Sequence, residues 1–180
     1  MTKKLSIIDK DIDTILVLDF GSQYTQLIAR RIRELGVYSE ILPWDISSER
    51  LKCVKPKGVI LSGGPESVTK TNTPRISNEI FALSVPILGI CYGMQTLAEQ
   101  NDGKVTTSSK KEFGYSKFSI EQDSLLFKGI NTKEIEVWMS HGDKVSSLPN
   151  NFELTGSTES AQIASMEHKE LPYYALQFHP

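Results

Sequence analysis

The apolar positions of this chain follow one pattern in its first half and another in its second. In the first half, short apolar runs alternate with segments whose apolar residues recur every three or four positions. The runs predict buried strands, and the periodic segments predict amphipathic helices. The predicted strands are Thr14–Asp19, Val37–Leu42, Gly58–Leu61 and Val85–Ile90, and the predicted helices are Ser22–Leu35, Ile46–Leu51, Pro74–Leu83 and one that begins at Tyr92. Such alternation favours a parallel sheet with helices on both of its faces.

The first predicted helix carries signals for its start and its end. Ser22 is expected to be the N-cap, and Gly36 is expected to end the helix just beyond its last turn. The apolar residues at helical spacing, which are expected to face the core, are Tyr24, Leu27, Ile28, Ile32 and Leu35. The arginines between them are expected to face water.

The second half of the chain predicts strands joined by short polar turns rich in glycine, asparagine and aspartate. These strands are Val105–Thr107, Tyr115–Glu121, Ile135–Met139, Phe152–Ser157, Gln162–Glu167 and Tyr173–Phe178. Short connections favour antiparallel hairpins, some of them extending the main sheet. The predicted fold class is α/β, an open, twisted, mostly parallel sheet flanked by helices, with antiparallel strands in the second half. Residues 1–13 are predicted to be a flexible extension, and residues 14–180 the folded domain.

Composition and charge narrow the classes of function. A chain of 180 residues that is 39% hydrophobic suits one domain with a substantial core. A formal net charge of −2 favours neither nucleic acid nor an anionic membrane as a partner. The sequence has no membrane-length apolar run, no visible signal peptide and no disulfide framework, so a cytoplasmic location is expected. It also has no cysteine or histidine cluster with metal-ligand spacing, so no metal is expected.

Cys91 lies where an apolar run meets a predicted helix, between Gly89 and Gly93. A glycine on either side of a nucleophile is typical of a sharp strand-to-helix turn that exposes the nucleophile at the carboxyl end of a sheet. The partial positive charge of a helix N-terminus favours a thiolate there. The alternative is that Cys91 is a small buried hydrophobic residue. Cys53 has no such surroundings and is predicted to be structural or at the surface.

A cysteine nucleophile that attacks a carbonyl group needs a base and donors for the oxyanion. The backbone N–H of Tyr92, the residue after Cys91, can supply one donor. Ser62-Gly-Gly-Pro65 can supply another, although it also fits an ordinary turn. Of the three histidines, His168 lies in a charged turn and is expected to be solvated, whereas His141 and His179 each follow an apolar strand.

Three stretches taken together resemble the class I (triad-type) glutamine amidotransferases, a flavodoxin-like family. They are Leu61–Pro65, Gly89–Gln95 and Gln177–Pro180. Further stretches are similar to the glutaminase domain of the glutamine-hydrolysing GMP synthetases, namely Asp19–Arg31, Ser62–Ser67, Glu112–Tyr115 and Trp138–Lys144. The resemblance covers nearly all of the chain from Ile15 to Pro180.

This resemblance implies a role for each matching residue. Cys91 would attack the side-chain amide of L-glutamine, His179 would be the base, and Gly64 (rather than Gly63) and Tyr92 would donate N–H groups to the oxyanion. The substrate-binding residues would be Gln95, Ser140, Gly142 and Asp143, with Ser140 and Gly142 acting through backbone groups. His141 would belong to the same glutamine-binding turn and would not be the base. No cofactor is implied for this domain. The ammonia would pass to a synthetase domain that uses ATP and magnesium to convert XMP to GMP.

The sequence departs from the family pattern at its last residues. The family continues His-Pro with a glutamate that orients the histidine, and this sequence stops at Pro180. The ATP pyrophosphatase and dimerisation domains are also absent from it. The chain is therefore expected to be a piece of a longer protein that folds but hydrolyses glutamine poorly. Three alternatives stay open: the glutaminase of another synthetase (anthranilate, carbamoyl phosphate or CTP), a γ-glutamyl hydrolase or peptidase-like cysteine hydrolase, and a non-catalytic binding domain.

Overall fold

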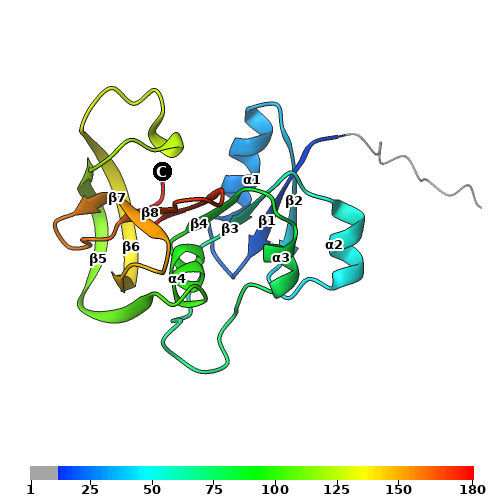
Figure 1. Cartoon of the computed structure of the whole chain (residues 1–180), viewed down its shortest axis with the longest axis horizontal. Coiled ribbons are helices and arrows are strands. Elements are labelled where there is room, and N and C mark those ends of the chain that lie inside the picture. Colours follow the sequence, from blue (N-terminus) through cyan, green and yellow to red (C-terminus); the bar gives the residue numbers. More distant parts are fainter. Residues whose placement is uncertain (1–11) are drawn as a thin grey trace, which may run out of the picture.

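The computed structural model describes residues 12–180, with the side chains of residues 109–111 left aside. The predicted N-terminal extension, residues 1–13, lies almost entirely outside this range, so its flexibility stays a prediction. In the described part of the chain, nine strands form one sheet in the order β2-β1-β3-β4-β9-β8-β7-β5-β6. Figure 1 shows this sheet running through the whole molecule, from β2 on one side to β5 and β6 on the other.

The sheet has a parallel part and an antiparallel part. The parallel strands are β1 (Thr14–Asp19), β2 (Tyr38–Pro43), β3 (Gly58–Leu61), β4 (Ile87–Ile90) and β9 (Tyr173–Leu176). The antiparallel strands are β5 (Lys104–Ile120), β6 (Glu134–Ser147), β7 (Phe152–Thr158) and β8 (Ser165–His168). The predicted α/β fold is confirmed, and the antiparallel part is as extensive as the parallel part, because four of the eight strand pairings are antiparallel.

The strand reached last along the chain lies in the middle of the sheet. β9 pairs with β4 in parallel and with β8 antiparallel, and so joins the two parts. The carboxyl ends of parallel neighbours meet at one edge of a sheet, where open α/β folds bind their ligands. The residues that follow β4 and β9, Cys91 and His179 among them, therefore lie close together.

Four α-helices and one 3₁₀ helix lie within the described residues. They are α1 (Thr25–Glu34), α2 (Ser48–Val54), α3 (Asn78–Ala82), α4 (Tyr92–Glu99) and η1 (Leu125–Phe127). Figure 1 shows α1 on one face of the parallel strands and α3 and α4 on the other. The larger core cluster lies on the α4 face, where Leu16 and Leu61 of the sheet and Leu97 of α4 are fully buried.

Helix α1 departs from its prediction in where it begins and in the face that it buries. It begins at Thr25 with Tyr24 as the N-cap, and Ser22 contributes by accepting a hydrogen bond from the N–H of Tyr24 at 3.0 Å. Its buried residues are Thr25 and Ala29. Leu27 and Leu35, predicted to face the core, are 46% and 83% exposed. The helix lies close to the sheet through small residues, and this close approach turns both leucines outward.

Helix α3 is shorter than predicted because the segment before it is held by side chains. The segment at Pro74–Ile76 was predicted to be helical, but the carboxamide of Gln100 donates to the carbonyl of Ile76 and accepts from its N–H. These contacts replace the helical hydrogen bonds, and the helix begins at Asn78.

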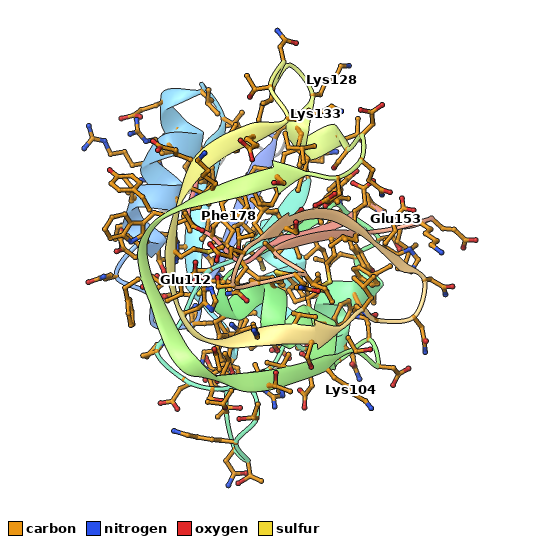
Figure 2. The ribbon with its side chains drawn as sticks, turned by 90° about the vertical axis from the view of Figure 1, so that its left-hand side faces the viewer. Lys104, Glu112, Lys128, Lys133, Glu153 and Phe178 are labelled. Atoms are coloured by element: carbon orange, nitrogen blue, oxygen red, sulfur yellow. The ribbon has the colours of Figure 1, made fainter. Side chains whose placement is uncertain are left out.

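The second half contains five strands rather than the six predicted: β5 and β6 are longer than predicted, whereas β8 and β9 are shorter than the predicted Gln162–Glu167 and Tyr173–Phe178. Val105–Thr107 and Tyr115–Glu121 belong to one strand, β5, with an irregular register between Thr107 and Glu112. β6 continues past the predicted end at Met139 as far as Ser147, so His141 lies within a strand and not in a turn. Figure 2 shows β5 and β6 as a long curved ribbon, with Glu112 at its bend. A register irregularity bends a strand pair without ending it, so the polar residues there did not mark a turn.

Candidate active site

Cys91 occupies a sharp turn between a parallel strand and a helix, as predicted. β4 ends at Ile90 and α4 begins at Tyr92, and Cys91 between them has φ 54° and ψ −107°. A non-glycine residue with positive φ is uncommon, and such strain gathers at functional sites. A Cβ atom on Gly93 would lie 2.3 Å from the carbonyl oxygen of Leu61, and one on Gly89 would lie 2.7 Å from Gly93. Both glycines are therefore required by the close packing of α4 on the strands.

The thiol of Cys91 is buried and protonated. The side chain is 6% exposed, and its Sγ donates to the carbonyl oxygen of Ser140 at 3.6 Å. Burial, followed by the negative charge of Asp143, raises the pKa of the thiol to about 11, against the opposing effect of the N–H of Tyr92 and of the nearby Gln177 side chain. The helix N-terminus favours the thiolate as expected, through the N–H of Tyr92, but burial outweighs this effect in the resting site.

His179 lies across a small gap from Cys91, at the position of Gly63. A Cβ atom built on Gly63 would lie 3.4 Å from Cε1 of His179 and 3.6 Å from Cβ of Cys91. The backbone N–H of His179 donates to the carbonyl of Trp138 at 2.9 Å, and its ring packs on Tyr24 with ring centroids 4.7 Å apart. His179 is therefore held at both backbone and ring.

The environment of His179 favours its neutral form. Burial, and then the nearby charge of His141, lower the pKa of His179 from its ordinary value. A neutral imidazole can accept a proton from a thiol at neutral pH, which is the property that a general base needs. The structure thus brings together the two residues predicted to be nucleophile and base.

A cavity of about 460 Å³ opens beside Cys91. Its lining comes from the loop after β3, from the start of α4 and from the strands β5 and β6. Among the predicted site residues, those in the lining are Gly64, Cys91, Gln95, Ser140, Gly142 and Asp143. Tyr92 and His179 are not part of the lining. The size is within the range of small-molecule sites.

Gly64 is confined by the turn after β1. A Cβ atom at Gly64 would lie 2.6 Å from the carbonyl oxygen of Phe20. Ser62 holds this loop, because its hydroxyl accepts from the N–H of Phe20 and donates to the carbonyl of Gly63. Gly64 therefore lines the cavity at a position that tolerates no side chain, and its role as an oxyanion donor stays a prediction.

Asp143 and Gln95 form a buried polar group at the back of the cavity. Asp143 is 8% exposed, its carboxylate accepts from Ser67, and its carbonyl oxygen accepts from Nε2 of Gln95 at 2.8 Å. The same Nε2 donates to Oε1 of Gln177 at 3.2 Å. The sequence analysis gave no role to Ser67 or Gln177, although both lie within the stretches that carry the family resemblance.

His141 lines the cavity with both ring nitrogens engaged. Nδ1 donates to the carbonyl oxygen of Asp143 at 3.0 Å, and Nε2 lies 3.1 Å from the Glu112 carboxylate, which also accepts from Ser160. Burial lowers the pKa of His141, and the charge of Glu112 opposes that effect. These contacts support the prediction that His141 is not the base, since no ring nitrogen remains for a thiol proton. Glu112 was given no role by the sequence analysis.

The remaining candidates lie outside this site. His168 was expected to be solvated, but its Nδ1 accepts from the N–H groups of Glu170 and Leu171 and it is partly buried. Cys53 is exposed, as predicted. A larger, open cavity of about 750 Å³ lies at the connection between β5 and β6 and contains none of the predicted site residues.

Residues 12–180 contain neither a cluster of metal ligands nor a membrane-length apolar helix. No group of three or more histidine, cysteine, aspartate or glutamate side chains there could hold a metal ion. Over the same residues, no helix has the length and apolar character needed to cross a membrane.

Comparison with known proteins gives consistent matches over nearly the whole chain. The chain is 51% identical over 172 residues to a "GMP synthase [glutamine-hydrolyzing]" of Histophilus somni (strain 2336), covering 92% of this chain and 33% of the relative. It is 52% identical over 180 residues to the protein of that name from Hamiltonella defensa subsp. Acyrthosiphon pisum (strain 5AT), covering 95% of this chain and 34% of the relative. The chain thus spans about a third of the length of these curated relatives.

Solved structures match the fold. A Thermoplasma acidophilum protein described as a putative GMP synthase superposes with a TM-score of 0.78 at 34% identity, covering 94% of this chain and 84% of that one. A glutamine amidotransferase from Thermotoga maritima superposes with a TM-score of 0.72 over 93% of this chain and 75% of that one; at 20% identity it supports the fold alone. The family model described as "Glutamine amidotransferase class-I" matches residues 16–180. With this match over almost its entire length, the chain belongs to the class I glutamine amidotransferase family.

Proposed function

We propose that this chain hydrolyses L-glutamine to glutamate and ammonia. The observation that carries the proposal is the position of Cys91. It occupies a strained turn, lines a cavity, and is separated from His179 by the space beside Gly63. Cys91 transfers its proton to His179, and the sulfur attacks the side-chain amide carbon of glutamine. The N–H groups of Gly64 and Tyr92 stabilise the resulting oxyanion. Collapse of the intermediate breaks the C–N bond, and His179 returns the proton to the departing ammonia.

The covalent intermediate is a glutamyl thioester on Cys91. A water molecule, deprotonated by His179, attacks the thioester carbonyl and releases glutamate and the free thiol. Glutamine is bound by Gln95, Ser140, Gly142 and Asp143. Asp143 brings a buried carboxylate to the cavity lining, which suits the α-ammonium group of the substrate. Ser140 and Gly142 act through backbone groups on β6.

The ammonia is delivered to a synthetase domain that converts XMP to GMP with ATP and magnesium. Two findings support this partner: the curated relatives carry the name GMP synthase, and this chain corresponds to about a third of each. In this proposal, the glutaminase domain itself uses no cofactor. The protein acts in the cytoplasm, where its two free cysteines would remain reduced.

The test is covalent labelling with a chloroketone analogue of glutamine, followed by mass spectrometry and an assay of ammonia release. We expect one adduct, on Cys91, which free glutamine suppresses. Cys91→Ser abolishes both the adduct and ammonia release, and Cys53→Ser leaves both intact. An adduct on Cys53, or none, overturns the proposal. Cleavage of γ-glutamyl peptides in preference to glutamine points instead to a γ-glutamyl hydrolase.

A further inference from the structure

Gln177 is a fully buried side chain with one hydrogen-bonding group left unused. It follows β9, is 0% exposed, and its backbone N–H donates to the carbonyl of Ala164 at 2.8 Å. Its Oε1 accepts from Nε2 of Gln95 at 3.2 Å. Its own Nε2 has no hydrogen-bond partner. Leaving a buried N–H group unpaired is costly, so such a group calls for a specific explanation.

The neighbours of Gln177 indicate which group its Nε2 faces. Ile90 and Leu176 are partners in the parallel pairing of β4 and β9, and the N–H of Cys91 donates to the carbonyl of Leu176 at 2.8 Å. Gln95 lies one helical turn after Cys91, with its N–H bonded to the carbonyl of Cys91 at 3.1 Å. The carboxamide of Gln177 therefore lies between Gln95 and Cys91. Because its oxygen is bonded to Gln95, its nitrogen is the part of the carboxamide left to interact with the neighbouring thiol of Cys91, whose pKa the Gln177 side chain lowers.

The chemistry of the proposed reaction supplies a partner for this nitrogen. In the resting state the sulfur is a hydrogen-bond donor, to Ser140 at 3.6 Å. When the proton passes to His179, the sulfur becomes an anion in a buried site and needs donors of its own. The N–H of Tyr92 is one such donor.

We propose that Gln177 holds a second amide donor in place for the Cys91 thiolate, and that its bond to Gln95 fixes the direction of that donor. This inference rests on the proposed function, in which Cys91 is the nucleophile. It makes Gln177 a positioning residue in the activation of Cys91, with no bond to glutamine itself. The nearby Gln177 side chain lowers the pKa of the thiol, which is in accord with this role.

Two substitutions separate thiolate stabilisation from simple support of Gln95. Gln177→Met keeps the length of the side chain and removes both the donor and the acceptor. Gln177→Glu keeps an oxygen that can accept from Gln95, but it presents a second oxygen, and negative charge, to the sulfur. If Gln177 donates to the thiolate, both substitutions destabilise the thiolate of Cys91, and the Glu substitution destabilises it more. If Gln177 only supports Gln95, Gln177→Met leaves the alkylation rate of Cys91 unchanged, whereas the added charge of Gln177→Glu slows alkylation in either case.

The experiment measures the rate of Cys91 alkylation by iodoacetamide between pH 7.5 and pH 11, in the Cys53→Ser background so that a single thiol reacts. This readout needs neither glutamine nor a synthetase domain, so it is independent of whether the chain is a glutaminase. We expect Gln177→Met to slow alkylation about tenfold or more at a fixed pH below the thiol pKa, and to shift the rate profile to higher pH. Gln177→Glu should slow it further. The control is Gln26→Met, at an exposed position on α1, which should match the parent.

Thermal melts followed by circular dichroism establish that each variant is folded before its rate is interpreted. Should the Met variant unfold, Gln177→Leu takes its place, because it also lacks the donor and adds no charge; a folded Met or Leu variant with the alkylation profile of the parent overturns the inference. Loss of the chloroketone adduct in the parent chain would instead overturn the proposed function, and the two failures are therefore distinct.

Discussion

Two opposite effects act on the pKa of the Cys91 thiol, and their balance sets whether the sulfur is protonated before substrate is attacked. The start of α4 supplies an N–H donor that favours the anion, whereas burial and Asp143 favour the neutral thiol. With a pKa of about 11, only a minute fraction of the sulfur is anionic at neutral pH. In the proposed reaction, the anion therefore forms mainly as glutamine is attacked, with His179 as the acceptor of its proton. A thiol kept neutral at rest is also protected from oxidation and unwanted alkylation, since the thiolate is the reactive form.

Gly63 lies between Cys91 and His179, the proposed nucleophile and base, so a side chain at this position should impair catalysis more than folding. In Gly63→Ala, the new Cβ lies in ordinary contact distance of His179 Cε1 (3.4 Å) and Cys91 Cβ (3.6 Å), so the chain is expected to fold. The added methyl group alters the approach of the two side chains, and a misplacement of about 1 Å can cost about 10²-fold in rate. We expect at least a tenfold fall in ammonia release with little change in the melting temperature. Unchanged turnover would mean that His179 reaches Cys91 by another route.

The two cavity-side histidines should differ sharply in what their removal does. His179→Ala removes the proposed base and is expected to lower the rate of thioester formation at saturating glutamine by about 10²–10⁴-fold. His141→Ala leaves the carboxylate of Glu112 without its ring partner and loosens β6, so it should raise KM and lower stability, with a smaller effect on kcat. Rapid-quench measurement of acylation compares them. A larger loss of acylation rate in His141→Ala would reverse the assignment.

At the residue scale, the sequence predicted the chemistry but not the support around it. The pattern Gly-x-Cys-x-Gly indicated the strained turn, because glycines on either side of a nucleophile are typical of a sharp strand-to-helix turn. Glu112, Ser67 and Gln177 could not be found in this way. Each contacts a partner that is distant in sequence. Glu112 and His141, for example, are 29 residues apart. Only the pairing of β5 with β6 brings that carboxylate to that ring.

At the element scale, the contact of α4 with β3 is the tightest requirement of the site. The backbone of Gly93 lies against Leu61, and its N–H donates to the carbonyl of Ser62 at 3.1 Å. This contact fixes the height of Cys91 above the sheet. It also explains why seven of the eight residues of α4 are buried, an unusual share for a helix on the face of a sheet.

Gly93→Ala is therefore expected to destabilise the fold strongly. The new Cβ would lie 2.3 Å from a backbone oxygen, and no rotation of a side chain can relieve that contact. Overpacking of this kind typically costs about 1–3 kcal/mol, and each kcal/mol lowers the melting temperature of a domain of this size by about 2–4 °C. Calorimetric melting of Gly93→Ala beside Gly63→Ala checks this, and equal melting temperatures would contradict it.

Elements were predicted well where local pattern and tertiary packing agree. The parallel strands appeared as apolar runs because both of their faces are covered. The continuity of β5 across residues 108–114 could not be predicted, since most of that stretch is polar and its pairing with β6 is irregular between Thr107 and Glu112. The orientation of α1 was mispredicted for a related reason, because Thr25 and Ala29 allow the helix to approach the sheet more closely than leucines would.

At the scale of the whole molecule, the site lies where the parallel and antiparallel parts of the sheet meet. Cys91 and Gly64 follow strands of the parallel part, and Ser140 to Asp143 lie on β6 at the far end of the sheet order. The two long strands reach back over the start of α4 because they curve, as Figure 2 shows. Neither part alone contains a complete cavity.

Acid should destabilise the whole molecule before its carboxylates are protonated. Burial lowers the pKa of both His141 and His179, so the unfolded chain binds protons more readily than the folded chain. Stability is then complete above the ordinary histidine pKa of about 6.5 and decreases as the pH falls below it. We expect the free energy of unfolding in urea to be lower at pH 5.5 than at pH 7.5. The double variant His141→Asn and His179→Asn should show a smaller difference, and an equal difference would contradict this origin.

The central position of β9 has a consequence for the order in which the protein is made. A ribosome releases β1 to β4 first, yet the strand that joins them to β8 begins only at Tyr173. Until that strand emerges, the nascent chain carries two unfinished sheets, each with an open edge able to pair with other chains. Synthesis of β9 therefore joins the two parts of the sheet and brings His179 beside Cys91 in the same step, and until then the nascent chain is most in need of chaperones.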